Sequence, residues 1–129
     1  MLDKYIQALI KDLEIEGTLA SPIPGVFNFP LEENLNVTIA DKAPGFSLAC
    51  NVAPIPKTKE EEFYTRCLLG NLFFQGTKGS VLGISEDGNI LTLTQTIEHN
   101  ADYKEFKDVL EDFINSVDYW REETGRYAA

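Results

Sequence analysis

Histidine is nearly absent from this sequence, and its scarcity excludes several kinds of catalytic and metal site. His99 is the single histidine, so a metal site built on a histidine cluster is excluded by count. A Ser-His-acid or Cys-His centre has this one residue to use, and it lies in the polar segment Glu98-His99-Asn100. We therefore expect a surface or capping role for His99.

Cysteine is also scarce, with Cys50 and Cys67 as the two thiols. Their spacing fits neither a disulfide framework nor a zinc site. Both lie within apolar runs, where a reduced cysteine usually packs as a small hydrophobic side chain. We interpret both as core residues, and a reactive thiol is the alternative.

Basic residues are few, since 11 Lys and Arg stand against 21 Asp and Glu, for a net charge of −10. Nucleic-acid binding depends on cations at the phosphates, and an anionic membrane repels an acidic chain. No apolar run approaches the ~20 residues of a membrane span, and charges interrupt the N-terminal apolar pattern, unlike in a signal peptide. We expect a cytoplasmic protein that neither binds nucleic acid nor inserts into a membrane. Its charge suits a basic partner or simple solubility.

Sequence motifs for catalysis and cofactor binding are missing as well. The chain has no GxSxG nucleophile turn and no GxGxxG after a predicted strand. Gly76, Gly79 and Gly83 lack the Gly-Lys-Ser/Thr of a phosphate loop, and the acidic clusters lack the calcium-loop pattern. We expect a protein that is not an enzyme and has no cofactor or metal. Activity through acidic residues or Cys67 is the alternative.

The residues that are present predict one folded domain over residues 1–129, with 43% hydrophobic residues. Apolar residues at spacings of three and four predict helices over residues 2–14, 60–75 and 102–123, with a frayed tail from residue 125. Alternating apolar residues predict strands over 26–29, 35–40, 46–53, 80–84 and 89–97, with an Asp-Gly turn between the last two. This order, α-β-β-β-α-β-β-α, indicates an α+β fold in which three helices cover an antiparallel sheet.

The predicted helix over residues 60–75 has apolar residues on more than one face. A surface helix of a monomer is about half polar, so we expect this helix to be covered on two sides. Gly70 costs about 1 kcal/mol relative to Ala in a helix interior. Close approach of a second helix would justify that cost, and so would a tight contact between the helix and the sheet. Both explanations stay open.

The order of elements and the run Cys67-Leu68-Leu69-Gly70-Asn71-Leu72-Phe73 resemble the class I type III secretion chaperones, the Tir chaperone family. In that family two apolar residues, an Asn, a Leu and an aromatic precede a Gly-containing turn, a strand, an acidic Gly turn and a second strand. Residues 76–88 and 90–94 match this run. The closing helix matches the family's end through Phe106, Leu110, Phe113 and Trp120-Arg121. The resemblance covers most of the chain, whereas residues 22–30 and the first strand match poorly.

The resemblance implies a homodimer whose subunits meet through the middle helix. The residues that it assigns to the dimer interface are Phe63, Cys67, Gly70, Asn71 and Phe74. The apolar pattern on two sides of this helix supports a dimer independently. The alternative is that the second apolar face packs under the sheet of the same subunit.

The resemblance also implies a client, the unfolded N-terminal segment of one or more secreted effector proteins. This segment would stay extended and wrap around the dimer, and strand addition would contribute. The residues expected to contact it are Tyr5, Ile6, Leu9, Val37, Ile39 and Leu48, each of which also fits an ordinary core position. The alternative function is a regulatory module that docks on a folded partner such as transcription machinery.

Overall fold

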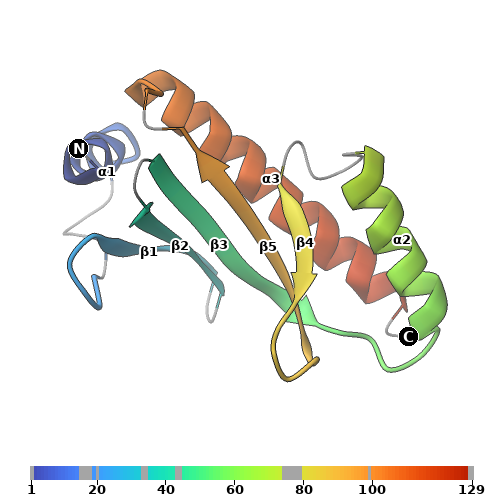
Figure 1. Ribbon diagram of the computed structural model, residues 1–129. Coiled ribbons are helices and arrows are strands. Elements are labelled where there is room, and N and C mark those ends of the chain that lie inside the picture. The colour runs from blue at the N-terminus through green and yellow to red at the C-terminus, as the bar shows by residue number, and fades with distance from the viewer. Residues whose placement is uncertain are drawn as a thin grey trace.

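The computed structural model describes residues 2–14, 19, 21–32, 35–42, 45–73, 80–98 and 100–127, with the side chains of 72 and 73 left out. The described residues form three helices and five strands in the predicted order α-β-β-β-α-β-β-α (Figure 1). The elements are α1 (Leu2–Asp12), β1 (Val26–Glu32), β2 (Leu35–Lys42), β3 (Gly45–Pro54), α2 (Glu60–Phe73), β4 (Val81–Ile84), β5 (Ile90–Ile97) and α3 (Tyr103–Tyr127). The predicted fold class is confirmed.

The five strands form one antiparallel sheet in the order β1-β2-β3-β5-β4. β1 and β4 are therefore its two edges. The turn between β4 and β5 closes as predicted, because Gly88 takes a φ of +78° and its N–H donates to the Ser85 carbonyl. The Asp87 carboxylate accepts hydrogen bonds from the Ser85 hydroxyl and the Asn89 N–H, and these bonds lower its pKa.

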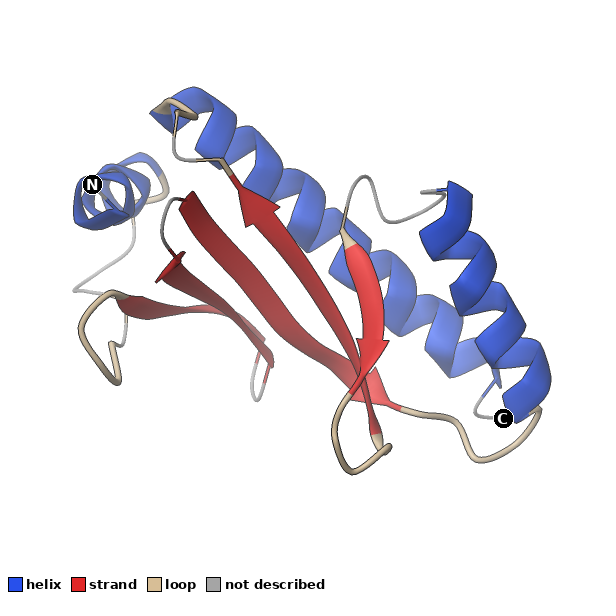
Figure 2. Ribbon diagram, in the orientation of Figure 1, coloured by secondary structure: helices blue, strands red, loops and turns tan. Residues whose placement is uncertain are grey.

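The core lies between α3 and one face of the sheet (Figures 1 and 2). Helical spacing directs one stripe of α3 inward, and all of its members are buried: Phe106, Leu110, Phe113, Val117 and Trp120. Alternation along the strands directs the buried side chains of β2, β3 and β5 toward this stripe. α1 lies beside the start of α3, and α2 lies beside β4 and the later part of α3 (Figure 1).

Two element boundaries differ from the sequence prediction by more than two residues, while the described ends of the other elements differ by two or fewer. β1 continues through Pro30 to Glu32, because an edge strand tolerates a proline whose missing N–H is not needed by the neighbouring strand. α3 continues to Tyr127 instead of fraying from Gly125, because Thr124 is buried and the ring of Tyr127 packs on Phe63 at 5.4 Å. Tertiary contacts thus extend both elements beyond the ends that the local sequence predicts.

Among the described residues, no helix combines the length and the apolar character that crossing a membrane requires.

Candidate binding surfaces

The residues predicted to contact a client lie mostly in the core of the subunit. Ile6 and Leu9 of α1 are 3% and 1% exposed. Val37, Ile39 and Leu48 are fully buried on the inner face of the sheet, where Ile39 and Leu48 are cross-strand neighbours. In this conformation the five side chains face the core rather than solvent. Their contact with a client stays a prediction, and it requires these elements to move.

Tyr5, the sixth predicted client residue, is half-buried and joins α1 to the start of α3. Its hydroxyl donates a hydrogen bond of 2.8 Å to the carbonyl of Ala101. Its ring lies 5.8 Å from Phe46 and 5.3 Å from Phe106, within the range of favourable aromatic contacts. The structure therefore gives Tyr5 a packing role, while its contact with a client stays untested.

A second link holds the end of α1 against α3. The hydroxyl of Tyr103 donates to the carboxylate of Asp12 at 2.7 Å, and the Lys107 ammonium lies 3.8 Å from the same oxygen. Burial of the phenol, followed by the neighbouring Asp12 carboxylate, raises the pKa of Tyr103 to about 12. The hydroxyl therefore stays protonated and able to donate at neutral pH.

The residues predicted for the dimer interface point mostly into their own subunit. Phe63 is fully buried, and Cys67 and Gly70 are buried with it, at positions i, i+4 and i+7 of one helix face. The Asn71 side chain is half-buried and hydrogen-bonded to the backbone of Leu82 on β4. Phe74 lies outside the described residues. This face of α2 therefore packs on the body of the subunit.

The opposite face of α2 and the neighbouring β4 carry large apolar side chains that no part of the described chain covers. Leu68 is 68% exposed and Leu69 is 45% exposed on α2, and Val81 and Ile84 are 51% and 50% exposed on β4. We call these four residues the α2–β4 patch. A groove of about 390 Å³ runs between the two elements and is lined by Leu68 and Ile84, whereas Val81 lies on the other face of β4, beside Thr94. Grouped apolar side chains of this kind mark protein-binding surfaces.

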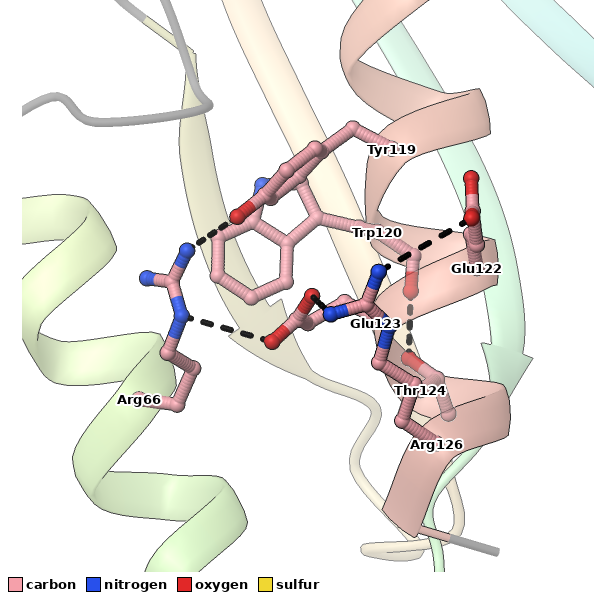
Figure 3. A network of polar contacts seen from close by, with 7 residues as sticks. All are labelled: Arg66, Tyr119, Trp120, Glu122, Glu123, Thr124 and Arg126. Atoms are coloured by element: carbon pink, nitrogen blue, oxygen red, sulfur yellow. Dashed lines mark hydrogen bonds and ion pairs between the residues drawn. The ribbon is translucent and has the colours of Figure 1, made fainter.

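A polar network fixes α2 to α3 (Figure 3). The guanidinium of Arg66 donates a hydrogen bond to the hydroxyl of Tyr119 and lies 3.5 Å from the carboxylate of Glu123. It also lies 5.0 Å from the ring centroid of Trp120, a cation–π geometry. Glu123 contacts Arg126 in turn at 3.8 Å. The exposed face of α2 is thereby held in a defined orientation.

No described helix or strand covers the face of the sheet opposite α3, which carries small uncharged side chains. Asn28, Thr38, Ala49 and Thr94 lie next to one another across four strands, and the Thr38 hydroxyl donates to the Asn28 side-chain oxygen at 3.3 Å. At the β1 edge, Phe27 and Leu31 are half-buried and pack against the core. Among the described residues, this edge has no further strand beside it. β1 therefore presents free backbone groups beside partly exposed apolar side chains.

The two thiols behave as core groups. Cys50 and Cys67 are both buried, and desolvation raises the pKa of each to about 11, against a smaller lowering by Arg121 and Arg66 respectively. A thiol with this pKa is almost entirely protonated at neutral pH and is a poor nucleophile or metal ligand. Within the described part of the chain, no three His, Cys, Asp or Glu side chains gather as a metal site.

The α2–β4 patch was missed by the sequence analysis, although part of it was open to prediction. The i, i+4, i+7 spacing of Phe63, Cys67 and Gly70 marks one helix face, and Leu68 and Leu69 fall away from it. Because these two leucines lie off the buried face, the spacing alone indicates that they are free to contact a partner. The exposure of Val81 and Ile84 depends on the place of β4 at the sheet edge, which no local signal reveals.

Comparisons with known proteins agree with this fold. The model of the Tir chaperone protein (CesT) family matches residues 5–121. A Chlamydia pneumoniae protein, CPj0713/CpB0740, is 26% identical over 127 residues, which are 97% of each chain.

Three solved structures have a similar fold at low sequence identity. A chain of the HopA1–SchA chaperone–effector complex is 17% identical with a TM-score of 0.73, over 94% of this chain and 93% of that one. A chain of the ExsC–ExsE complex is 14% identical with a TM-score of 0.75, over 94% and 91%. A chain of the heterodimeric ExoU–SpcU complex from the type III secretion system of Pseudomonas aeruginosa is 14% identical with a TM-score of 0.65, over 99% and 95%.

Proposed function

Because the chain belongs to the Tir chaperone protein (CesT) family, we propose that it is a type III secretion chaperone. It binds the extended N-terminal segment of one or more secreted effectors and keeps them soluble and competent for secretion. The match of the family model to residues 5–121 is the observation that carries this proposal. The fold supports it, since it is shared with a chain of a chaperone–effector complex and with a chain of a complex from a type III secretion system.

The α2–β4 patch supports a homodimer as the working form. The sequence analysis assigned the dimer to α2, and we now propose that the contacts come from the exposed Leu68, Leu69, Val81 and Ile84 rather than from the inward face of α2. A two-fold axis through this patch would bring the same surface of both subunits together. Each apolar side chain that leaves water contributes roughly 25 cal/mol per Å² of buried area.

The β1 edge supports an extended client. A client segment that adds as a strand there would pair its backbone with the free groups of β1, while alternate side chains meet Phe27 and Leu31. Ordering a disordered segment costs conformational entropy, so this apolar contact must offset that cost. The acidic surface, with a net charge of −10, keeps a protein with uncovered apolar side chains soluble and favours basic clients.

We propose that the protein acts by binding alone, in the bacterial cytoplasm, as one domain over residues 1–129. Its family consists of chaperones. The buried thiols, with pKa values of about 11, favour a structural role for both cysteines over a catalytic one.

Isolation of the native complex tests this function. The chain should be purified with its partner from cells that produce it, and the partner should then be expressed in fragments. We expect the N-terminal fragment of a secreted protein to bind, and to be unfolded by circular dichroism when alone. A partner that binds as a folded domain, with no contribution from its N-terminal segment, would support the regulatory alternative instead.

A further inference from the structure

The carboxamide of Asn71 binds both backbone groups of one residue on β4. The Leu82 N–H donates to Asn71 Oδ1 at 2.7 Å, and Asn71 Nδ2 donates to the Leu82 carbonyl at 3.0 Å. A side-chain amide carries one carbonyl acceptor and an NH₂ donor, so it presents the same pair of groups as a peptide unit. Asn71 therefore bonds to β4 as a neighbouring strand would.

The position of β4 makes this pair of bonds significant. β4 is an edge strand, and in an antiparallel edge every second residue directs its N–H and C=O away from the sheet. Leu82 is such a residue, since its register partner is Leu93 on β5 while its own N–H and C=O bond to Asn71. A strand of four residues has few such outward groups, and Asn71 occupies those at Leu82.

These bonds also fix the later part of α2. Arg66 ties α2 to α3 through Tyr119 and Glu123, and Asn71 ties it to β4 five residues further on. Leu68 and Leu69 lie between these two attachment points. Asn71, Leu68 and Ile84 line one groove, so the amide sits where the two halves of the α2–β4 patch meet.

We propose that Asn71 is a positioning residue for self-association. It holds α2 against the β4 edge, so that Leu68 of α2 and Ile84 of β4 line one groove at the α2–β4 patch. This inference rests on the proposed dimer. The family resemblance implies a direct contact of Asn71 between subunits, whereas its hydrogen bonds to Leu82 lie within one subunit.

Amide hydrogen exchange tests the positioning without a partner. It should be measured by NMR in a Leu68→Glu background, in which the patch is disrupted and the second subunit is absent. With Asn71 present, the Leu82 amide should exchange slowly although it lies on a sheet edge. Asn71→Leu should speed its exchange about tenfold or more, because it removes the acceptor of the Leu82 N–H, and Leu93 should be unaffected. Fast exchange of Leu82 with Asn71 present would overturn the proposal without any need for a variant.

Sedimentation velocity then tests the effect on the dimer. In the chain that retains Leu68, Asn71→Leu should raise the dissociation constant of the dimer about tenfold or more. Ile97→Val removes a buried methyl group at the end of β5, where Ile97 pairs with Phe46 on β3. It serves as the control for lost stability alone. It should leave the dissociation constant unchanged. A dimer that survives Asn71→Leu would overturn the role of Asn71 only, whereas a monomeric unaltered protein would overturn the proposed dimer as well.

Discussion

The guanidinium of Arg66 lies 5.0 Å from the ring centroid of Trp120, and the indole beneath it is fully buried. Arg66 belongs to α2 and Trp120 to α3, so one side chain of α2 completes the cover of the largest core residue of α3. The carboxylate of Glu123 lies 3.5 Å from the same guanidinium and is itself mostly shielded from solvent. This contact joins the element that carries half of the α2–β4 patch to the body of the fold.

Arg66→Ala should lower the free energy of unfolding by about 2 kcal/mol, because it removes the cation–π contact and leaves the shielded Glu123 with a weaker partner. Trp120 is the single tryptophan, so its emission should also shift to longer wavelength as water reaches the ring. Urea unfolding followed by fluorescence measures both effects. Arg126→Ala is the control, since its exposed pairs with Glu122 and Glu123 should contribute less than about 1 kcal/mol. Equal effects of the two variants would contradict this account.

Leu68→Glu should convert the dimer to a monomer at micromolar concentration, because the carboxylate would be desolvated at the centre of the α2–β4 patch. Light scattering of the purified protein measures the change. Leu13→Glu is the matched control, since Leu13 is 46% exposed just after the end of α1, away from the patch. The interface assignment fails if Leu68→Glu remains dimeric, or if Leu13→Glu dissociates equally.

The buried thiols should make stability depend on pH in the alkaline range. Folding raises the pKa of Cys50 and Cys67 from about 9 to about 11. A raised pKa in the folded state means that the unfolded chain loses the proton first. The contribution of the neutral thiols is therefore complete below pH 9 and is lost as the pH rises through 11.

Urea unfolding at several pH values between 9 and 11 measures this loss. The Cys50→Ala and Cys67→Ala double variant should show a shallower fall over that range than the unaltered chain. Parallel curves for the two proteins would count against buried, protonated thiols.

Tyr5→Phe should destabilise the fold by about 1 kcal/mol, because it deletes the hydroxyl that donates to the Ala101 carbonyl and keeps the ring in its aromatic cluster. Thermal unfolding measures the change. If Tyr5 also contacts a client through its hydroxyl, the same variant should weaken client binding. If the variant binds the client with unchanged affinity, the Tyr5 hydroxyl contributes to packing and not to client binding.

The order of the elements could be predicted from local patterns, because helical and alternating spacings are properties of short segments. The alternation of Leu35, Val37 and Ile39 identifies β2, and the Asp-Gly turn identifies the hairpin of β4 and β5. The ends predicted for β1 and α3 were each wrong by more than two residues, for the same reason. Pro30 and Gly125 are local stop signals, and contacts with distant residues override both.

The surfaces were harder to predict than the elements. Ile6, Leu9, Val37, Ile39 and Leu48 are apolar whether they face a client or the core, and the structure places them in the core. Asn71 was named as a dimer contact that the family resemblance implies, and its hydrogen bonds to β4 were not foreseen. Its partner on β4 is eleven residues further along the chain, and the sheet edge that it closes exists only in the folded chain.

Binding of the isolated N-terminal segment of the natural partner tests the chaperone assignment most directly. The segment should be titrated into the purified chain and followed by calorimetry, and its labelled form should be followed by NMR. The account predicts that a segment unfolded on its own binds in extended form, with two copies of this chain for each segment. An N-terminal segment that does not bind, while the folded remainder of the partner does, would contradict it.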